Sequence, residues 1–310
     1  MRLNVSPLED ARFLAALRTR RFHDEESRAG DERSDAAEVL LLVEGAALLS
    51  AVTRFGPHDA VLLQSPAILN LPLALSGTRG ISTHILAEGS ETVSFAVPEA
   101  RELTFSTGPD GPPFRRLALA TLATAVRGAN ASLSGFFGAF GATSPSAPRS
   151  GDAPAEVPVD DGQARDLFDA AGIDPAVLPA LGLTARVVPG GGRLLVAGEP
   201  GDEAFFVARG RLLVSIDIPG AGREALGFPG PGEIVGEMAL VDDAPRSADV
   251  WAHEGQALVY AMPRRVFRSL LESGDPAGAH LLGGLCAALC RRLEEALRKG
   301  AGFRLLAGPG

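Results

Sequence analysis

Residues 232–250 read GEIVGEMALVDDAPRSADV and form the most informative stretch of the chain. An apolar strand end runs into Gly236 and Glu237, a short helical turn is predicted next, and the run PRSA follows at residues 245–248. A Gly-Glu pair alone is common, and a single arginine is usually a surface residue. The combination of both in one segment, at this spacing, indicates a binding loop.

Short apolar runs separated by turn residues surround this stretch, as is typical of strands. Together they predict a compact all-β barrel or sandwich with helices on either side. The last predicted helix, AHLLGGLCAALCRRLEEALRKG at residues 279–300, ends at Gly300, a natural C-cap. Its apolar stripe consists of Leu282, Leu285, Cys286, Leu289 and Leu293. The predicted strands are ARVVP, RLLVAG, AFFVARG, RLLVSIDI, EALGF, ADVWAHE and ALVYAMP.

The two halves of the chain resemble each other. The sequence VLLLVEGAALLSAV in the first half matches AFFVARGRLLVSID in the second and places Gly45 on Gly210. At the same offset, Pro98 falls on Pro263. A repeat of this kind is the signature of a duplicated fold. The predicted class is therefore mainly β with flanking helices (α+β), arranged as two tandem double-stranded β-helix (jelly-roll) barrels.

A stretch rich in Pro, Ser, Ala and acid separates the halves. It reads ATSPSAPRSGDAPAEVPVDDG at residues 142–162, and without an apolar period it is predicted to be a linker. At 310 residues the chain is long enough for two domains. We expect a first domain at residues 1–141 and a second at residues 163–310, the second including the C-terminal helix.

The stretch at residues 232–250 resembles the phosphate-binding cassette of the cyclic-nucleotide-binding family. That family includes catabolite activator proteins, kinase regulatory subunits and nucleotide-gated channels, and its cassette reads G-E-(aliphatic)-A-L, then P-R-(small)-A. The resemblance extends over the second half, including the strand pair around Phe206 and Gly210. It implies cyclic AMP or cyclic GMP as the ligand, no cofactor and no metal. In the family, the helix after the barrel serves as a lid and often as a dimer seam.

The family's roles carry over to matching positions of this chain. The guanidinium of Arg246 would pair with the cyclic phosphate, helped by Ser247 and by backbone N–H groups after Gly236. The carboxylate of Glu237 would accept from the ribose 2′-hydroxyl. Both Glu237 and Arg246 are expected at the pocket rim. The predicted ligand-binding residues are Val235, Gly236, Glu237, Met238, Ala239, Arg246, Ser247 and Ala248.

The first half carries a degenerate version of this segment. In ILNLPLALSGTRGISTHI, residues 68–85, Asn70 and Leu71 fall on the glycine and the glutamate of the cassette, so the ribose carboxylate is missing. Arg79 reaches the position of the cassette arginine only across a one-residue gap. We expect this copy to be a scaffold, a dimer surface or a docking site for a partner, with an unrelated ligand as the alternative.

Several function classes are disfavoured by the rest of the chain. A formal net charge of -9 argues against a dominant nucleic-acid surface, and AGFRLLAGPG after Lys299 and Gly300 is too short for a DNA-binding domain. The five histidines lack metal spacing, and no nucleophilic triad is apparent. Neither a secretory signal nor an apolar run of membrane-spanning length occurs. The two cysteines are predicted to be reduced and buried.

The leading hypothesis is a cytoplasmic, non-enzymatic cyclic-nucleotide sensor. It would act through an unidentified protein partner, without contacting nucleic acid or a membrane, and the C-terminal helix would offer a surface for a homodimer. The alternative is a nucleotide-independent scaffold or dimerisation protein built from degenerate copies of the fold. An enzyme is the third reading, disfavoured because no catalytic constellation is seen.

Overall fold

The computed structural model forms two compact units. The first unit combines Met1–Leu133 with Gly274–Gly310, and the second is Ser134–Ser273. The residues that the structure describes are 7–16, 20–22, 27–29, 38–53, 56–77, 82–138, 153–170, 181–218 and 222–307.

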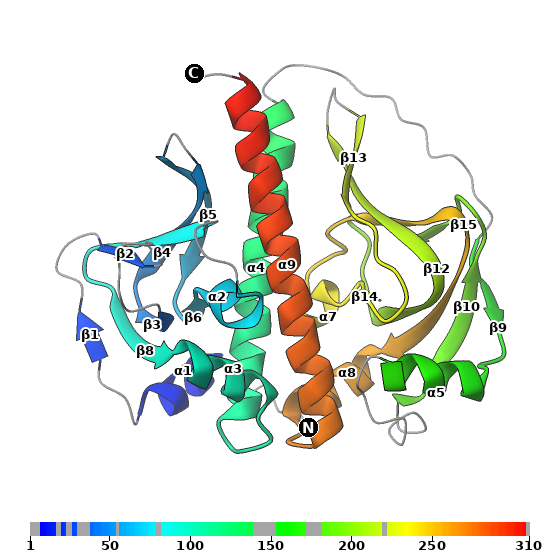
Figure 1. The fold of residues 1–310 in the computed structure, drawn as a ribbon, viewed down its shortest axis with the longest axis horizontal. Coiled ribbons are helices and arrows are strands. Elements are labelled where there is room, and N and C mark those ends of the chain that lie inside the picture. The colour runs from blue at the N-terminus through cyan, green and yellow to red at the C-terminus, as the bar shows by residue number, and fades with distance from the viewer. Residues whose placement is uncertain are drawn as a thin grey trace. The chain divides into compact units, whose positions relative to one another are not determined.

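The second unit is built on one antiparallel sheet of seven strands (Figure 1). Its main path runs β13-β12-β15-β10-β9, with β11 paired to β15 and β14 paired to β12. In sequence, helix α5 (Asp161–Ala170) lies between β9 and β10, helix α7 (Met238–Asp242) lies between β14 and β15, and helix α8 (Arg264–Glu272) follows β15. The strands are β9 (Ala155–Val157), β10 (Thr184–Val188), β11 (Arg193–Leu195), β12 (Glu203–Ile218), β13 (Gly222–Gly227), β14 (Ile234–Val235) and β15 (Asp249–Pro263).

The two long strands β12 and β15 enclose the core of this unit. Their pairing shifts register between Val207 and Arg209 and again between Arg209 and Arg211, and Gly210 within the second shift has a φ of +82°. A Cβ added there would lie 2.5 Å from the carbonyl oxygen of Gln256, so the position requires glycine. The bend lets side chains from both ends of each strand meet in one core, which includes Val188, Leu195, Phe205, Val207, Leu212, Val235, Val250, Ala252, Val259 and Ala261.

The first unit contains two antiparallel sheets of four strands each. Their orders are β1-β8-β3-β6 and β2-β7-β4-β5. The strands are β1 (Arg20–Phe22), β2 (Ser27–Ala29), β3 (Glu38–Glu44), β4 (Ala46–Thr53), β5 (Gly56–Gln64), β6 (Ala67–Leu69), β7 (Ser82–Leu86) and β8 (Glu91–Ala96). The helices are α1 (Pro7–Ala15), α2 (Leu71–Leu75), α3 (Val97–Phe105), α9 (Pro276–Ala307) and α4 (Gly111–Gly138), which belongs to this unit as far as Leu133.

The strand pairs of the two units correspond as the repeat predicts. Gly45 lies between β3 and β4 with a φ of +98°, matching the left-handed Gly210 in β12. The predicted α+β class is confirmed in its coarse form, since both units combine antiparallel sheets with helices, and the described helices are as prominent as the strands. Closure of the strands into two jelly-roll barrels stays a prediction.

The C-terminal helix α9 packs in the first unit, against α2, α3 and β4. This differs from the predicted second domain of residues 163–310, which included the helix as its lid. Its apolar stripe is buried, from Leu282 to Leu293. An apolar stripe predicts that a helix face is covered, but it does not specify which neighbour covers it. The predicted use of this helix as a surface for a homodimer stays a prediction.

The predicted linker at residues 142–162 is partly ordered. Of the part that the structure describes, Ala155–Val157 form β9 and pair with β10 in the register Ala185↔Val157 and Val187↔Ala155. Helix α5 begins at Asp161, after Asp160 accepts a hydrogen bond of 3.0 Å from the backbone N–H of Gln163. Strand pairing satisfies backbone groups whatever the side chains are, so a composition argument misses it. Residues 142–152 lie outside the described residues.

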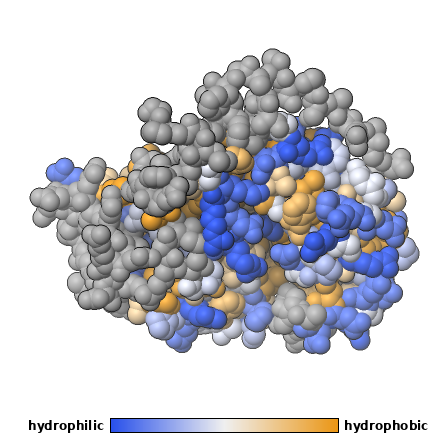
Figure 2. All heavy atoms as spheres, turned by 45° about the horizontal axis from the view of Figure 1, so that its top comes forward, coloured by the Kyte–Doolittle hydropathy of each residue, from blue (hydrophilic) through white to orange (hydrophobic). Residues whose placement is uncertain are grey.

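The surface mixes polar and apolar residues on the face shown in Figure 2. The large apolar side chains that are exposed in the described residues are Leu8, Phe13, Val52, Leu62, Phe105 and Phe228. Among the helices described, none is long and apolar enough to cross a membrane.

Candidate functional site

Strand β14 ends at Val235, directly before Gly236, the centre of the candidate site. It pairs with β12 in the register Phe205↔Val235. Gly236 has a φ of +78°, and a Cβ there would lie 2.7 Å from Nη1 of Arg246 and 3.0 Å from Cδ1 of Leu195. Both the backbone conformation and the available space therefore require glycine at this position. The short helix α7 follows directly.

Arg246 is held against this turn. Its Nη1 donates a hydrogen bond of 2.6 Å to the carbonyl oxygen of Gly236. Its backbone N–H donates to the carbonyl oxygen of Glu199 at 2.8 Å, and its own carbonyl accepts from Gly198 at 2.9 Å. A Cβ added to Gly201 would collide with the guanidinium, so this glycine makes room for it. The loop between β11 and β12 thus holds the backbone of Arg246 and leaves room for its side chain, which bonds to Gly236.

Arg246 is a buried positive charge with carboxylates and a second arginine, Arg264, nearby. Burial lowers the pKa of Arg246 from its ordinary value, while Asp202, Glu237 and Glu203 oppose this shift. Arginine remains charged under all physiological conditions despite such a shift. The site therefore holds a positive charge in a largely desolvated position, where its attraction for an anion is stronger than in water.

Glu237 is the N-cap residue of α7. Its carbonyl oxygen accepts hydrogen bonds from Leu240 at 2.9 Å and Val241 at 3.1 Å, whereas its side chain does not cap the helix. The residue is 1% exposed, and Arg246 is 8% exposed. The expectation that both lie at the pocket rim is therefore wrong. Burial of a carboxylate is costly unless a cation lies nearby, which explains why the acid and the arginine occur together.

The other predicted residues surround this pair. Ser247 Oγ lies 3.7 Å from the thioether sulfur of Met238 and donates a weak hydrogen bond to it. Val235, Ala239 and Ala248 are buried. In the structure, Arg246 and Ser247 contact Gly236 and Met238, so the two ends of the predicted site lie together. The role of the eight residues in binding a ligand stays a prediction.

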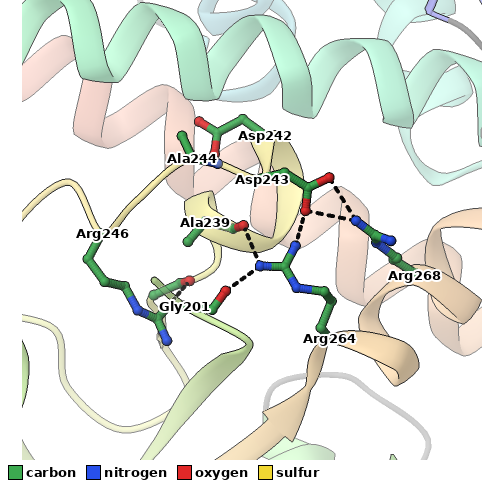
Figure 3. Close-up of polar contacts among 9 residues, drawn as sticks. Gly201, Ala239, Asp242, Asp243, Ala244, Arg246, Arg264 and Arg268 are labelled. Carbon is green, nitrogen blue, oxygen red and sulfur yellow. Dashed lines mark hydrogen bonds and ion pairs between the residues drawn. The ribbon is translucent and has the colours of Figure 1, made fainter. Parts of the chain in front are cut away.

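A polar cluster joins α7 to α8 (Figure 3). Arg264 donates to the carbonyl oxygen of Ala239 at 3.0 Å, and it also contacts the carbonyl oxygen of Gly201 and the carboxylate of Asp243. Arg268 forms an ion pair with the same carboxylate, at 2.7 Å. We call Asp243, Arg264 and Arg268 the α7–α8 cluster.

The sequence interpretation missed this cluster. Asp243 adopts a left-handed φ of +55° at the end of α7, a position that Asp tolerates better than most residues. Two features of the sequence point to it: Asp243 follows a predicted short helical turn, and Arg264 and Arg268 lie four residues apart in the next helix. Neither feature indicates which residues will be in contact, because the contacting residues are 21 and 25 positions apart in the sequence.

Metal binding finds no support in the part of the chain that the structure describes. No group of three or more His, Cys, Asp or Glu side chains there is placed to hold a metal ion. Cys286 and Cys290 are buried, as predicted, and burial raises the pKa of the Cys286 thiol to about 12. The raised pKa keeps the Cys286 thiol protonated at neutral pH, so it packs as a small apolar side chain.

Comparison with known proteins connects the site to a family. Residues 185–273 match the family model described as "Cyclic nucleotide-binding domain", which confirms the predicted resemblance for the second half. The "Cyclic AMP receptor protein" of Thermus thermophilus is 35% identical over 111 residues, covering 36% of this chain and 49% of the relative. A "Cyclic nucleotide-gated potassium channel" of Mesorhizobium japonicum is 43% identical over 82 residues, covering 26% of this chain and 21% of the channel. The chain spans half or less of both relatives.

Solved structures include similar chains. The catabolite activator protein of Thermus thermophilus shares 30% identity with this chain, covering 46% of it and 62% of the solved chain, with a TM-score of 0.34. The regulatory domain of Toxoplasma gondii PKA with cAMP shares 16% identity, covering 86% of this chain and 85% of the solved one, with a TM-score of 0.31.

Proposed function

We propose that the second domain binds cyclic AMP or cyclic GMP, and that the chain is a cytoplasmic regulatory protein that signals through a protein partner. It acts without catalysis, cofactor or nucleic-acid contact of its own, on a scaffold of two tandem jelly-roll barrels. The observation that carries the proposal is the pair of Arg246 and Glu237, both buried and both held at Gly236. The match of this region to a cyclic-nucleotide-binding family supports it.

The chemistry assigns each residue a part. Arg246 provides the counter-charge for the single negative charge of the cyclic phosphate, and Ser247 adds a donor. Glu237 accepts from the ribose 2′-hydroxyl, which distinguishes a nucleotide from a free phosphate. Val235, Met238, Ala239 and Ala248 shape the wall. A charge-assisted hydrogen bond contributes roughly 1.5 to 3 kcal/mol, so the arginine supplies a large part of the affinity.

A second candidate, a nucleotide-independent scaffold, is favoured by one observation. The guanidinium of Arg246 already donates to the Gly236 carbonyl and is nearly buried, so a phosphate must compete with that contact or bind beside it. This competition lowers the affinity that the site can offer. In the scaffold reading, the arginine serves only to hold the turn.

Isothermal titration of the purified chain with cyclic AMP and cyclic GMP separates the two candidates. We expect one nucleotide per chain, and no comparable heat from 5′-AMP, whose doubly charged open phosphate does not match a single guanidinium. The matched control is Arg211→Ala, which removes an exposed arginine of the same unit. Absence of binding at millimolar concentration, about 4 kcal/mol of binding free energy, would leave the scaffold as the function.

A further inference from the structure

The sheet of the second unit has a face opposite to its core, and this face carries the single tryptophan of the chain. Val250 and Ala252 of β15 lie in the core, so Trp251 between them points to the opposite face. The register pairs Trp251 with Leu213 of β12 on one side and with Arg193 of β11 on the other. Directly paired residues lie on the same face of a sheet, so these three side chains are neighbours.

Two arginines lie against the indole ring of Trp251. The guanidinium carbon of Arg223 is 4.2 Å from the ring centroid, and that of Arg193 is 4.9 Å from it. Arg223 belongs to β13, which lies beyond β12, whereas Arg193 comes from β11 on the other edge of β15. Both contacts are of the cation–π type, in which the face of the ring attracts the positive charge. The ring is therefore covered, at 4% exposure, while Arg223 itself is exposed.

The same face holds two buried polar groups that have no hydrogen-bond partner among the described residues. They are the indole Nε1 of Trp251 and the hydroxyl of Ser215, a fully buried residue. Ser215 lies two residues after Leu213 on β12, so it shares the face of Trp251. Buried donors nearly always have a partner, because a donor without one has lost its bond to water for nothing. Two such donors beside the arginines indicate a place for an acceptor from outside the chain.

The charges of the two arginines are balanced to different extents. Arg193 Nη1 lies 3.7 Å from Asp249 Oδ1, an oxygen that also accepts a hydrogen bond of 3.1 Å from the backbone N–H of Ala197. Arg223 has no ion pair among the described residues, since its guanidinium lies on the ring and not on Asp217, its partner in the register. The formal net charge of -9 repels an acidic partner, but this repulsion is screened beyond about 8 Å at physiological ionic strength. Close to the face, Arg223 therefore decides which charge is attracted.

An exposed aromatic ring lies beside this site. Phe228, directly after β13, is 46% exposed, and its ring centroid is 4.8 Å from that of His253. His253 lies two residues after Trp251 on β15 and therefore shares its face. Aromatic residues and arginine are enriched in protein–protein interfaces, and an apolar ring contributes nothing to the binding of a free ion. The combination thus fits a peptide segment better than a small anion.

We infer that Arg193, Ser215, Arg223, Phe228 and Trp251 form a docking face for an acidic segment of a protein partner. A carboxylate of that segment draws the guanidinium of Arg223 off the ring and accepts from the indole N–H and the Ser215 hydroxyl. A carboxylate is an acceptor with two oxygens, which matches one guanidinium and two neutral donors. An apolar side chain of the same segment covers Phe228. The inference rests on the proposed function in that it names the chemistry of its protein partner, but it needs no nucleotide.

Tryptophan fluorescence of the full chain tests the docking face without a label, because all of this emission comes from Trp251. The probe is a synthetic peptide rich in Glu and Leu, added in the absence of nucleotide. We expect a saturable change in emission, since binding moves Arg223 from the ring and brings a carboxylate to Nε1. Added salt should weaken the binding, because exposed charges are screened. No saturable change, or an equal change with Lys in place of every Glu, would overturn the inference.

Four variants locate the binding of the acidic peptide. Arg223→Gln should weaken it about tenfold or more, as expected when a charge-assisted hydrogen bond is lost. Ser215→Ala, which removes a neutral donor, should weaken it about threefold. Arg193→Gln should have a smaller effect than Arg223→Gln, since Asp249 already balances part of its charge. The matched control is Arg265→Gln, the same change of charge at an exposed position of α8, which should bind as the parent does. Equal weakening by Arg223→Gln and Arg265→Gln would show that net charge alone matters and would overturn the site.

A single-stranded oligonucleotide provides the competing polyanion. If it binds more tightly than the acidic peptide and loses affinity in Arg223→Gln, the partner of this face is a nucleic acid and the inference is wrong. Failure of the docking face is also distinct from failure of the proposed function. A chain that binds cyclic nucleotide but not the peptide keeps the nucleotide function and loses the docking face. A chain that binds the peptide but no nucleotide keeps the docking face and loses the nucleotide function.

Discussion

The β6–α2 segment of the first unit and the β14–α7 segment of the second are similar in local structure and different in side-chain chemistry. Each has a short strand, a left-handed residue and a helix of five residues. In the second, the buried acid Glu237 lies beside the guanidinium of Arg246. In the first, the buried residue is Leu71, and a helix from the far end of the chain covers it. The two segments thus share a left-handed residue and a short helix, and they differ in the side chains that they bury.

The largest effect is expected when the acid is placed in the wrong unit. Leu71→Glu buries a carboxylate in a pocket whose described lining lacks a cation, so the free energy of unfolding should fall by about 3 to 5 kcal/mol at pH 8. Protonation of the introduced acid should recover part of this loss near pH 4. Leu71→Met, which keeps the volume, should cost less than about 1.5 kcal/mol. Urea unfolding at both pH values measures the difference, and equal midpoints for the two variants would contradict the comparison.

His84, in the same pocket, should make the chain less stable in acid. Burial lowers the pKa of His84 to about 4 from 6.5. The unfolded chain therefore takes up this proton at a higher pH than the folded chain, so stability is lost as the pH falls from 6.5 to 4. The total is about 3 kcal/mol at 1.36 kcal/mol per pKa unit.

His84→Gln should remove this part of the acid sensitivity, and His253→Gln in the second unit should not. Urea midpoints measured at pH 7 and at pH 4.5 give the slope for each variant. The assignment fails if His84→Gln retains the parent's pH dependence.

Arg246→Ala should weaken nucleotide binding about tenfold or more. It removes the counter-charge of the phosphate, a contribution of roughly 1.5 to 3 kcal/mol. Because Arg246 also donates to the Gly236 carbonyl, some loss of folding stability is expected as well. Titration calorimetry below the unfolding temperature separates the two effects. Unchanged affinity in a folded variant would refute the phosphate role.

The smallest effect is expected for Glu237→Gln. Glutamine keeps the shape and one acceptor, so binding of a ribonucleotide should weaken by less than the arginine variant does. The difference between parent and variant should nearly vanish for a 2′-deoxy cyclic nucleotide, because the hydroxyl that Glu237 would bind is missing. Parallel titrations with both ligands provide the test, and an equal loss for both would place the acid elsewhere in the mechanism.

Much of the second unit could be predicted because its signals are local. The apolar runs between 185 and 263 became strands, and Gly236 and Gly210 adopt the left-handed conformations that glycine permits. The alignment of the two halves places Asn70 at the position of Gly236, and both residues have a left-handed φ. Arg79, the doubtful counterpart of Arg246, lies outside the described residues.

Other features could not be predicted because they depend on long-range partners. The strand at Ala155–Val157 exists through its pairing with β10, and Asp243 acquires its role from arginines more than twenty residues away. Composition and spacing describe a segment by itself. Composition and spacing do not show how much a second segment stabilises the first when the two pack together.

The sequence by itself determined the strand and turn pattern, the repeat and the combination of glycine, acid and arginine at residues 236–248, since these rest on backbone preferences and side-chain chemistry within short windows. Only the tertiary structure decided that Glu237 and Arg246 are buried, and that α9 packs against α2. Burial and docking are settled by which apolar surfaces meet, and an apolar stripe such as that of α9 fits more than one surface until the whole chain is folded.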